Sequence, residues 1–180
     1  TIRSREALRP VGSWTRPFIW LRELQRPEDY TLITPVQDKG FSLVFDDGRR
    51  WEPKNYDEEE RGEVPLHEAL AKSYNLPAVR VGLDVGVDTV RDTLQMLGVT
   101  SPISQYPSML LGSVAMTPVT VAQLYQSLAT SGFNTPLRSI RQVTDAEGEP
   151  LHRCPREANT VPDHAAVALY ACRTNETGNG

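Results

Sequence analysis

The chain has 180 residues, of which 39% are hydrophobic and 23% are charged, and its formal net charge is −4. This length suits one ordinary globular domain or most of one. Because 19 Lys and Arg stand against 23 Asp and Glu, the chain lacks the basic excess of nucleic-acid-binding proteins, and we expect no nucleic acid as a partner. No apolar run reaches the roughly 18 residues of a membrane span, and the first residues lack the features of a signal peptide.

The first predicted helix begins near Ser13. Its apolar residues recur close to the 3.6-residue period of an amphipathic helix, at Trp14, Phe18, Leu21 and Leu24. Pro17 has no amide proton and is tolerated only in the first turn of a helix. The helix therefore cannot begin much before Ser13.

The next segment, 41–51, predicts a β-hairpin. Phe41, Leu43 and Phe45 lie at alternate positions, and Asp47-Gly48 supplies a turn that favours positive φ. An acidic, polar loop is expected at 57–63.

A series of helices is predicted along 65–132. Pro65 is placed in the first turn of one helix, which ends near 73–75, and Pro77 opens another. Asp88 is expected to cap a third helix that stops at Gly98, and Thr117 to cap a fourth that reaches Gly132. Their apolar stripes predict one continuous core, formed by Leu66, Ala69, Leu70, Val79, Leu83, Leu94, Leu97, Val121, Leu124 and Leu128.

The last third of the chain predicts a second hairpin in 137–153, around a turn at 145–148, and a final helix at 165–172. The mixture indicates a helix-rich α+β fold with a few local hairpins.

The signatures of several common sites are absent from the sequence. There is no phosphate-binding loop, no dinucleotide fingerprint and no G-x-S-x-G elbow. His67-Glu68 opens like a zinc-protease helix, but Ala71 stands where the second ligand should be. Two cysteines, Cys154 and Cys172, form no C-x-x-C pair, which excludes an ordinary zinc ribbon. We therefore expect neither a metal nor a cofactor.

One pattern remains as a candidate for chemistry. Ser13 has a basic residue, Arg16, three positions later on the same helix face, and a helix N-terminus favours developing negative charge. Ser73 and Asn75 form a second polar group sixty residues further on. Taken in isolation, Ser13 is better explained as a plain N-cap and 73–75 as an ordinary helix-ending turn.

Several longer runs place these residues in context. In order, they are RPVGSWTRP at 9–17, WEPKNYD at 51–57, GEVPLHEALAKSYNLPAV at 62–79, PSMLLGS at 107–113, TPVTVAQ at 117–123 and SGFNTPL at 131–137. Together they resemble the transpeptidase domain of class A penicillin-binding proteins. They are most similar to the 1B-type bifunctional peptidoglycan synthases of Gram-negative bacteria.

The resemblance implies the helix-rich part of a penicillin-binding, serine β-lactamase-like α+β transpeptidase domain, with short hairpins and an incomplete central sheet. Residues 1–180 are then a partial domain, without the family's glycosyltransferase domain and membrane anchor. The implied partners are peptidoglycan stem peptides and β-lactams, and the implied location is the periplasmic side of the bacterial inner membrane.

The resemblance also assigns the site. Ser13 falls on the serine of the family's S-x-x-K motif, which is acylated by stem peptides ending in D-Ala-D-Ala or by β-lactams. Ser73 and Asn75 match the S-x-N motif, and no K-T-G motif occurs in the sequence. Arg16 replaces the motif lysine, and a guanidinium cannot act as a general base near neutral pH. We therefore expect weak or absent acylation.

Two alternatives stay open at this point. A non-catalytic binding module that keeps the cleft is favoured by Arg16 and by the lack of K-T-G. A serine β-lactamase shares the logic of S-x-x-K, but it needs a deacylating water and a base for that water.

Overall fold

The computed structural model describes residues 3–24, 28–130, 133–153 and 159–160. The predicted helix at 165–172 and both cysteines lie outside these residues. The helical elements are α1 (Arg3–Glu6), η1 (Gly12–Thr15), α2 (Arg16–Leu24), α3 (Leu66–Ala71), α4 (Asn75–Val85), α5 (Val87–Met96), η2 (Pro107–Leu111) and α6 (Pro118–Ala129), where η denotes a 3₁₀ helix. The strands are β1 (Arg9–Pro10), β2 (Pro35–Asp38), β3 (Leu43–Val44), β4 (Arg50–Trp51), β5 (Gly62–Pro65), β6 (Ala115–Met116), β7 (Phe133–Asn134), β8 (Gln142–Thr144), β9 (Pro150–Arg153) and β10 (Asn159–Thr160).

The core forms where α2 packs against α4 and α5. Helix α2 is buried nearly all round, with Phe18, Ile19 and Trp20 fully inaccessible to solvent. The predicted core is confirmed: Leu66, Ala69, Val79, Leu94, Leu97, Val121 and Leu124 are buried in one cluster, and Leu70, Leu83 and Leu128 are partly buried against it. Helix α4 approaches η2 so closely that a Cβ on Gly82 would lie 2.6 Å from the Leu110 side chain.

The strands form antiparallel pairs, each described strand having one partner. The pairs are β1 with β6, β2 with β5, β3 with β4, β8 with β9, and β7 with β10. The pairing of β2 with β5, in which Val36 lies opposite Val64, has no counterpart among the predicted hairpins. The predicted α+β class is confirmed.

Local turn chemistry explains the elements that were predicted correctly. Gly48 has a φ of +80° in the turn of the β3–β4 hairpin, and β8 and β9 flank the predicted turn at 145–148. The Thr117 side chain accepts a hydrogen bond from the Thr120 amide, 3.2 Å away, as expected of an N-cap.

The helix starts predicted at Pro65 and Asp88 are wrong. Pro65 is not in a first turn: its backbone is extended, because it closes β5 opposite Pro35. Asp88 is not a cap, since α5 follows directly on Gly86, whose φ is +95°. Asp88 lies instead inside the first turn, where its carboxylate pairs with Arg91 at 2.7 Å.

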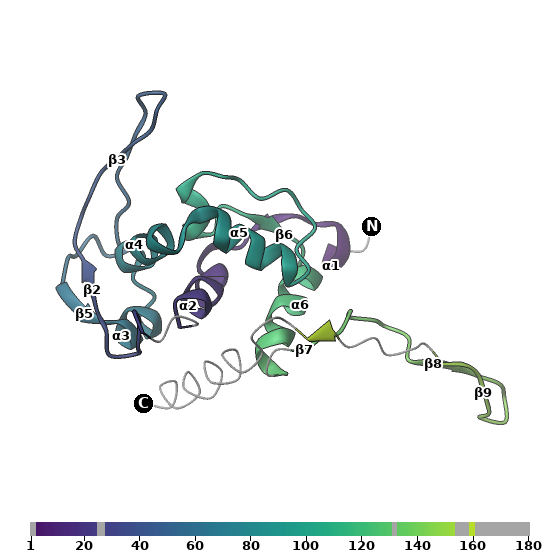
Figure 1. Cartoon of the computed structure of the whole chain (residues 1–180). Coiled ribbons are helices and arrows are strands. Elements are labelled where there is room, and N and C mark those ends of the chain that lie inside the picture. The colour runs from purple at the N-terminus through teal and green to yellow at the C-terminus, as the bar shows by residue number, and fades with distance from the viewer. Residues whose placement is uncertain (1–2, 25–27, 131–132, 154–158, 161–180) are drawn as a thin grey trace.

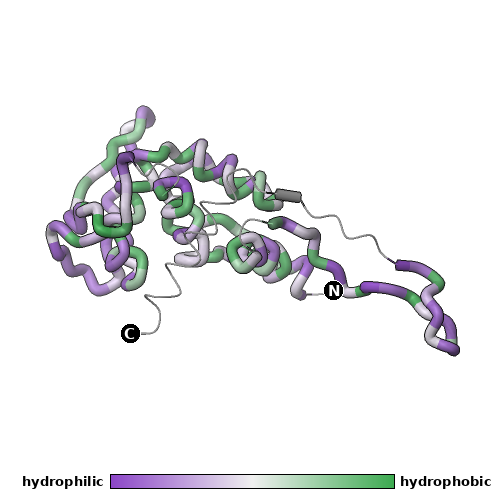
Figure 2. The backbone as a smooth tube through the Cα atoms, turned by 60° about the horizontal axis from the view of Figure 1, so that its bottom comes forward, coloured by the Kyte–Doolittle hydropathy of each residue, from purple (hydrophilic) through white to green (hydrophobic). Residues whose placement is uncertain are grey.

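Figure 1 shows the helices gathered in one body, with the β3–β4 hairpin and the β8–β9 hairpin projecting from it in different directions. Hydrophobic and hydrophilic stretches alternate along the helices of this body in Figure 2, as expected where each helix buries one face. The candidate site lies at the start of α2.

Candidate active site

Ser13 lies in the 3₁₀ turn that precedes α2. Its carbonyl oxygen accepts a hydrogen bond from the Arg16 amide, and its side chain is exposed. The sequence placed the start of the helix at Ser13, but the regular helix begins at Arg16 and Val11 occupies the N-cap position of the 3₁₀ turn. Pro17 is in the first turn of α2, as its missing amide proton requires. Ser13 is therefore presented on a tight turn and does not cap the helix.

The backbone before Ser13 is held by the loop that precedes β6. Val11 donates to the Val114 carbonyl at 3.1 Å, and Gly12 donates to the Gly112 carbonyl at 3.0 Å. These bonds continue the β1–β6 pairing up to the serine. The position of Ser13 thus depends on a segment a hundred residues later in the chain.

Arg16 joins the two predicted motifs directly. Its Nη1 donates to the carbonyl oxygen of Ser73 and to the Ser73 hydroxyl, and its Nη2 donates to Oδ1 of Asn75. The structure therefore brings Arg16, Ser73 and Asn75 together across 57 to 59 residues of sequence. Ser13 lies three residues before Arg16, in the 3₁₀ turn that leads directly into α2, and within the described residues its hydroxyl has no hydrogen-bond partner.

The guanidinium of Arg16 is a buried cation. Arg16 is only 5% exposed, and in the described part of the chain no carboxylate forms an ion pair with it. Burial lowers the pKa of Arg16 below its ordinary value of 12.5, because a low-dielectric environment disfavours the charged form. The group nevertheless stays protonated near neutral pH, so it supplies positive charge and hydrogen-bond donors but no base.

Ser73 occupies a strained turn between α3 and α4. Its φ is +58°, in the left-handed region that residues other than glycine rarely adopt. The amide of Ser73 donates to the Leu70 carbonyl and that of Tyr74 to the Ala69 carbonyl, each at 3.0 Å. The turn exposes the Ser73 side chain and leaves Asn75 half-buried. Such strain is characteristic of functional turns, where the surroundings hold it.

Sequence reasoning missed the residues beneath this turn. Asn55 accepts hydrogen bonds from the amides of Asn75 and Leu76, and it donates to the buried carboxylate of Asp38. The only signal in the sequence was the run WEPKNYD at 51–57, which was matched as a block without a role for any residue.

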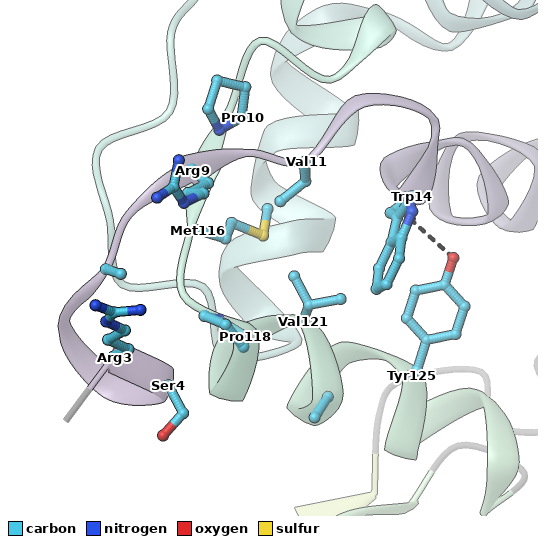
Figure 3. A pocket seen from close by; sticks show the side chains of 12 residues that line it. Arg3, Ser4, Arg9, Pro10, Val11, Trp14, Met116, Pro118, Val121 and Tyr125 are labelled. Atoms are coloured by element: carbon cyan, nitrogen blue, oxygen red, sulfur yellow. Dashed lines mark hydrogen bonds between the residues drawn. The ribbon is translucent and has the colours of Figure 1, made fainter.

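A separate apolar groove lies on the other side of Trp14. It has a volume of about 860 Å³ and is lined by residues of α1, β1 and α6, together with Met116 of β6. Figure 3 shows Trp14 and Tyr125 together at one end and Arg3 at the other. The Tyr125 hydroxyl donates to the Trp14 carbonyl at 3.1 Å, and burial raises the pKa of that hydroxyl. The groove is mainly apolar, and none of the four predicted site residues is among those that line it.

Within the described ranges, no group of three or more His, Cys, Asp or Glu side chains is arranged to hold a metal ion. In the same residues, no helix combines the length and the apolar character that crossing a bilayer demands.

Comparison with known proteins assigns the family. The profile of the penicillin binding protein transpeptidase domain matches residues 35–171. The chain belongs to the penicillin-binding protein transpeptidase family. That match includes Ser73 and Asn75 but begins after Ser13 and Arg16.

Individual relatives extend the comparison to the start of the chain. Penicillin-binding protein 1B of Vibrio cholerae is 45% identical over 174 residues, which is 95% of this chain and 22% of the relative. The crystal structure of penicillin-binding protein 1A from Haemophilus influenzae superposes with a TM-score of 0.80 at 26% identity, over 88% of this chain and 24% of that one. The chain thus spans about a fifth of the length of the curated relatives that it matches.

A more distant structure supports the fold alone. Penicillin-binding protein A of M. tuberculosis, solved as an imipenem acyl-enzyme complex, has a TM-score of 0.79 at 19% identity. The match covers 98% of this chain and 44% of the M. tuberculosis chain.

Proposed function

We propose that this chain carries the nucleophile half of a D,D-transpeptidase site, with Ser13 as the acylated residue, and that its acylation is slow. The observation that carries the proposal is the hydrogen bonding of Arg16 to both Ser73 and Asn75. These bonds connect the segment that carries Ser13 with the S-x-N motif, as expected if both belong to one site. They also place a guanidinium at the position where the reaction needs a base. The relatives are named penicillin-binding proteins, which supports the same assignment.

The proposed reaction is an acyl transfer. The Ser13 Oγ attacks the carbonyl carbon of the penultimate D-alanine of a stem peptide, and the C–N bond to the last D-alanine breaks. The departing amine takes up the proton that the serine hydroxyl loses, and an acceptor amine later attacks the ester and releases Ser13. With a β-lactam, the ring C–N bond breaks instead, and its nitrogen takes the proton but stays attached, so the ester persists.

Each site residue has a proposed part in this step. Arg16 supplies a fixed positive charge that stabilises the tetrahedral oxyanion or the carboxylate of the bound substrate. Ser73 offers the exposed hydroxyl beside it, and the amide of Asn75 orients the substrate. None of them removes the serine proton, and the loss of general-base assistance costs about 10²- to 10⁴-fold in rate.

The proposal includes the setting of the reaction. We infer that the partners are peptidoglycan stem peptides and β-lactams, and that the chain works as an acyltransferase on the periplasmic side of the bacterial inner membrane. The names of its relatives, penicillin-binding proteins 1A and 1B, support this setting.

The test is mass spectrometry of the intact full-length gene product after incubation with a fluorescent penicillin. We expect a slowly formed adduct of one penicillin on the wild-type protein, none on Ser13→Ala, and a rate at least about tenfold higher on Arg16→Lys, because a lysine can act as the base. An adduct on Ser13→Ala, or no adduct on either wild type or Arg16→Lys, would overturn the proposal. An adduct that hydrolyses within seconds would identify a β-lactamase instead.

A second candidate function is favoured by the same arginine. A non-catalytic binding domain would use the buried guanidinium to hold the carboxylate of a peptide without forming a bond to Ser13. Its signature is saturable, reversible binding of an acyl-D-Ala-D-Ala peptide by both wild type and Ser13→Ala, with no mass adduct on either or on Arg16→Lys.

A further inference from the structure

Asn55 is a buried amide at the centre of a polar network. It is 5% exposed and lies in the loop that follows β4. Its Oδ1 accepts from the amide of Asn75 at 2.8 Å and from that of Leu76 at 3.2 Å. Its Nδ2 donates to Oδ1 of Asp38 at 2.6 Å and to the carbonyl oxygen of Glu59 at 2.8 Å. One side chain thereby satisfies two backbone donors and two acceptors.

Only an amide of this length fits all four partners. An aspartate would offer acceptors to the two helix amides but no proton to Asp38 or Glu59, and an alanine would offer nothing. Asparagine is therefore the residue that the surroundings require.

Asp38 in turn fixes Asn55. This carboxylate is fully buried at the end of β2, and Arg61 contacts its other oxygen through Nη1 and through the backbone amide, each at 3.3 Å. The Arg61 guanidinium also lies 4.2 Å from the centre of the Tyr74 ring. Two contacts thus connect these segments: Asn55 bonds to the first amides of α4, and Arg61 packs on Tyr74.

The neighbouring residue, Lys54, completes the contact with Asn75. Its carbonyl oxygen accepts from Nδ2 of Asn75 at 2.6 Å, while Arg16 donates to Oδ1 of the same side chain. Both polar atoms of the Asn75 side chain therefore have a partner: Nδ2 bonds to Lys54 and Oδ1 bonds to Arg16. Its backbone is fixed by Asn55.

We propose that Asn55 is a positioning residue for the Ser13 site, which sets the orientation of Asn75 through its bonds to Asp38 and to the first amides of α4. This inference rests on the proposed function of that site. Asn55 does not touch the reacting atoms. It acts through Asn75, whose amide meets both Arg16 and the substrate.

The test compares Asn55→Ala with Asn55→Asp in the full-length Arg16→Lys protein, where acylation is fast enough to time. Asn55→Ala removes all four bonds and should lower the second-order rate constant for penicillin by about 10²-fold, the cost of a displacement near 1 Å in an active site. Thr93→Val is the matched control. Thr93 is a buried polar residue, 4% exposed, whose hydroxyl donates to the Thr89 carbonyl within α5 and, among the described residues, bonds to no other group. Its loss should leave the rate unchanged.

Asn55→Asp gives a pH signature that a general loss of stability does not. Its new oxygen would face the Asp38 carboxylate, and two carboxylates in contact cannot both ionise, so one pKa of the pair rises, although Arg61 on the far side of Asp38 limits the rise. Below that pKa the shared proton restores the donor to Asp38. We expect the rate relative to the parent to recover partly at pH 5 and to fall about tenfold by pH 8. A flat ratio across this range would overturn the inference.

Amide hydrogen exchange separates this inference from the proposed function. If the parent does not acylate, the proposed function fails, but the exchange of the Asn75 and Leu76 amide protons still reports the positioning. Exchange should accelerate at both residues in Asn55→Ala and stay unchanged in Thr93→Val. Unchanged exchange in a folded Asn55→Ala protein would overturn the inference, as would an unchanged acylation rate in a parent that does acylate.

Discussion

Gly112 and Gly12 pack backbone against backbone at the entrance to the serine turn. A Cβ added to Gly112 would lie 1.8 Å from the Gly12 carbonyl oxygen, and the φ of Gly112 is +81°. Gly112→Ala should therefore lower the free energy of unfolding by about 3 kcal/mol or more, the sum of left-handed strain and a backbone collision that no side-chain rotation relieves. Urea denaturation measures the loss.

Gly48→Ala is the control for that prediction. Gly48 has nearly the same φ, +80°, but an added Cβ there meets nothing within 4 Å. The substitution should cost only about 1 kcal/mol, from the backbone conformation alone. Equal losses for the two variants would show that the contact between Gly112 and Gly12 does not shape the serine turn.

Leu124 is the side chain of α6 that should be most costly to truncate. It is 2% exposed and belongs to the core cluster. Leu124→Ala should destabilise the protein by about 2 to 5 kcal/mol, since it removes buried methyl groups and leaves a cavity. The comparison is Leu151→Ala in β9, where Leu151 is 68% exposed, and there thermal and urea unfolding should change by less than about 0.5 kcal/mol.

The pairing of Asp57 with Arg61 should make stability depend on acidity. The hydrogen bond from Arg61 lowers the pKa of Asp57 below its ordinary value of 3.8. The contribution of this pair is therefore fully present above pH 3.8 and is lost as pH falls through the lower pKa of the folded state. Asp57→Asn should reduce the free energy of unfolding at pH 7, and its difference from wild type should shrink progressively as the pH falls below 3.8.

The size of that difference should be small, because both side chains reach solvent and salt screens them. Asp46→Asn provides the comparison, since Asp46 forms no ion pair in the part of the chain that the structure describes. A difference for Asp57→Asn that persists unchanged to the lowest pH would contradict the assignment of this bond.

Local signals in the sequence predicted local structure well. The pair Thr117-Pro118 located the start of α6, and Asp47-Gly48 located a hairpin, because each feature depends on residues a few positions apart. Helical periodicity also predicted which leucines share the core. The start of α5 was misplaced because Asp88 and Gly86 both suit a helix start. The positive φ of Gly86, which decides between them, is not visible from the sequence.

Contacts between distant residues could not be predicted in this way. Asp38 ends a strand that pairs with β5, and Asn55 reaches it from 17 residues away, but neither residue lies in a periodic pattern. Arg16 meets Ser73 across 57 residues, and only resemblance to a family indicated that they belong together. The catalytic roles of Ser13, Arg16, Ser73 and Asn75 stay predictions until acylation is measured.

The cap of α4 also bears on how the chain can vary in length. Tyr74, at the N-cap position, offers no side-chain hydrogen bond to the first amides of the helix, so these amides depend on Asn55, 20 residues earlier. The first turn of α4 is complete only when the intervening segment, which contains β5 and α3, brings Asn55 back to it. Each doubling of a loop adds only about 0.6 kcal/mol to its closure. We expect the chain between Asn55 and Asn75 to accept insertions only where they leave this network intact, which excludes Glu59, whose carbonyl oxygen accepts from Asn55.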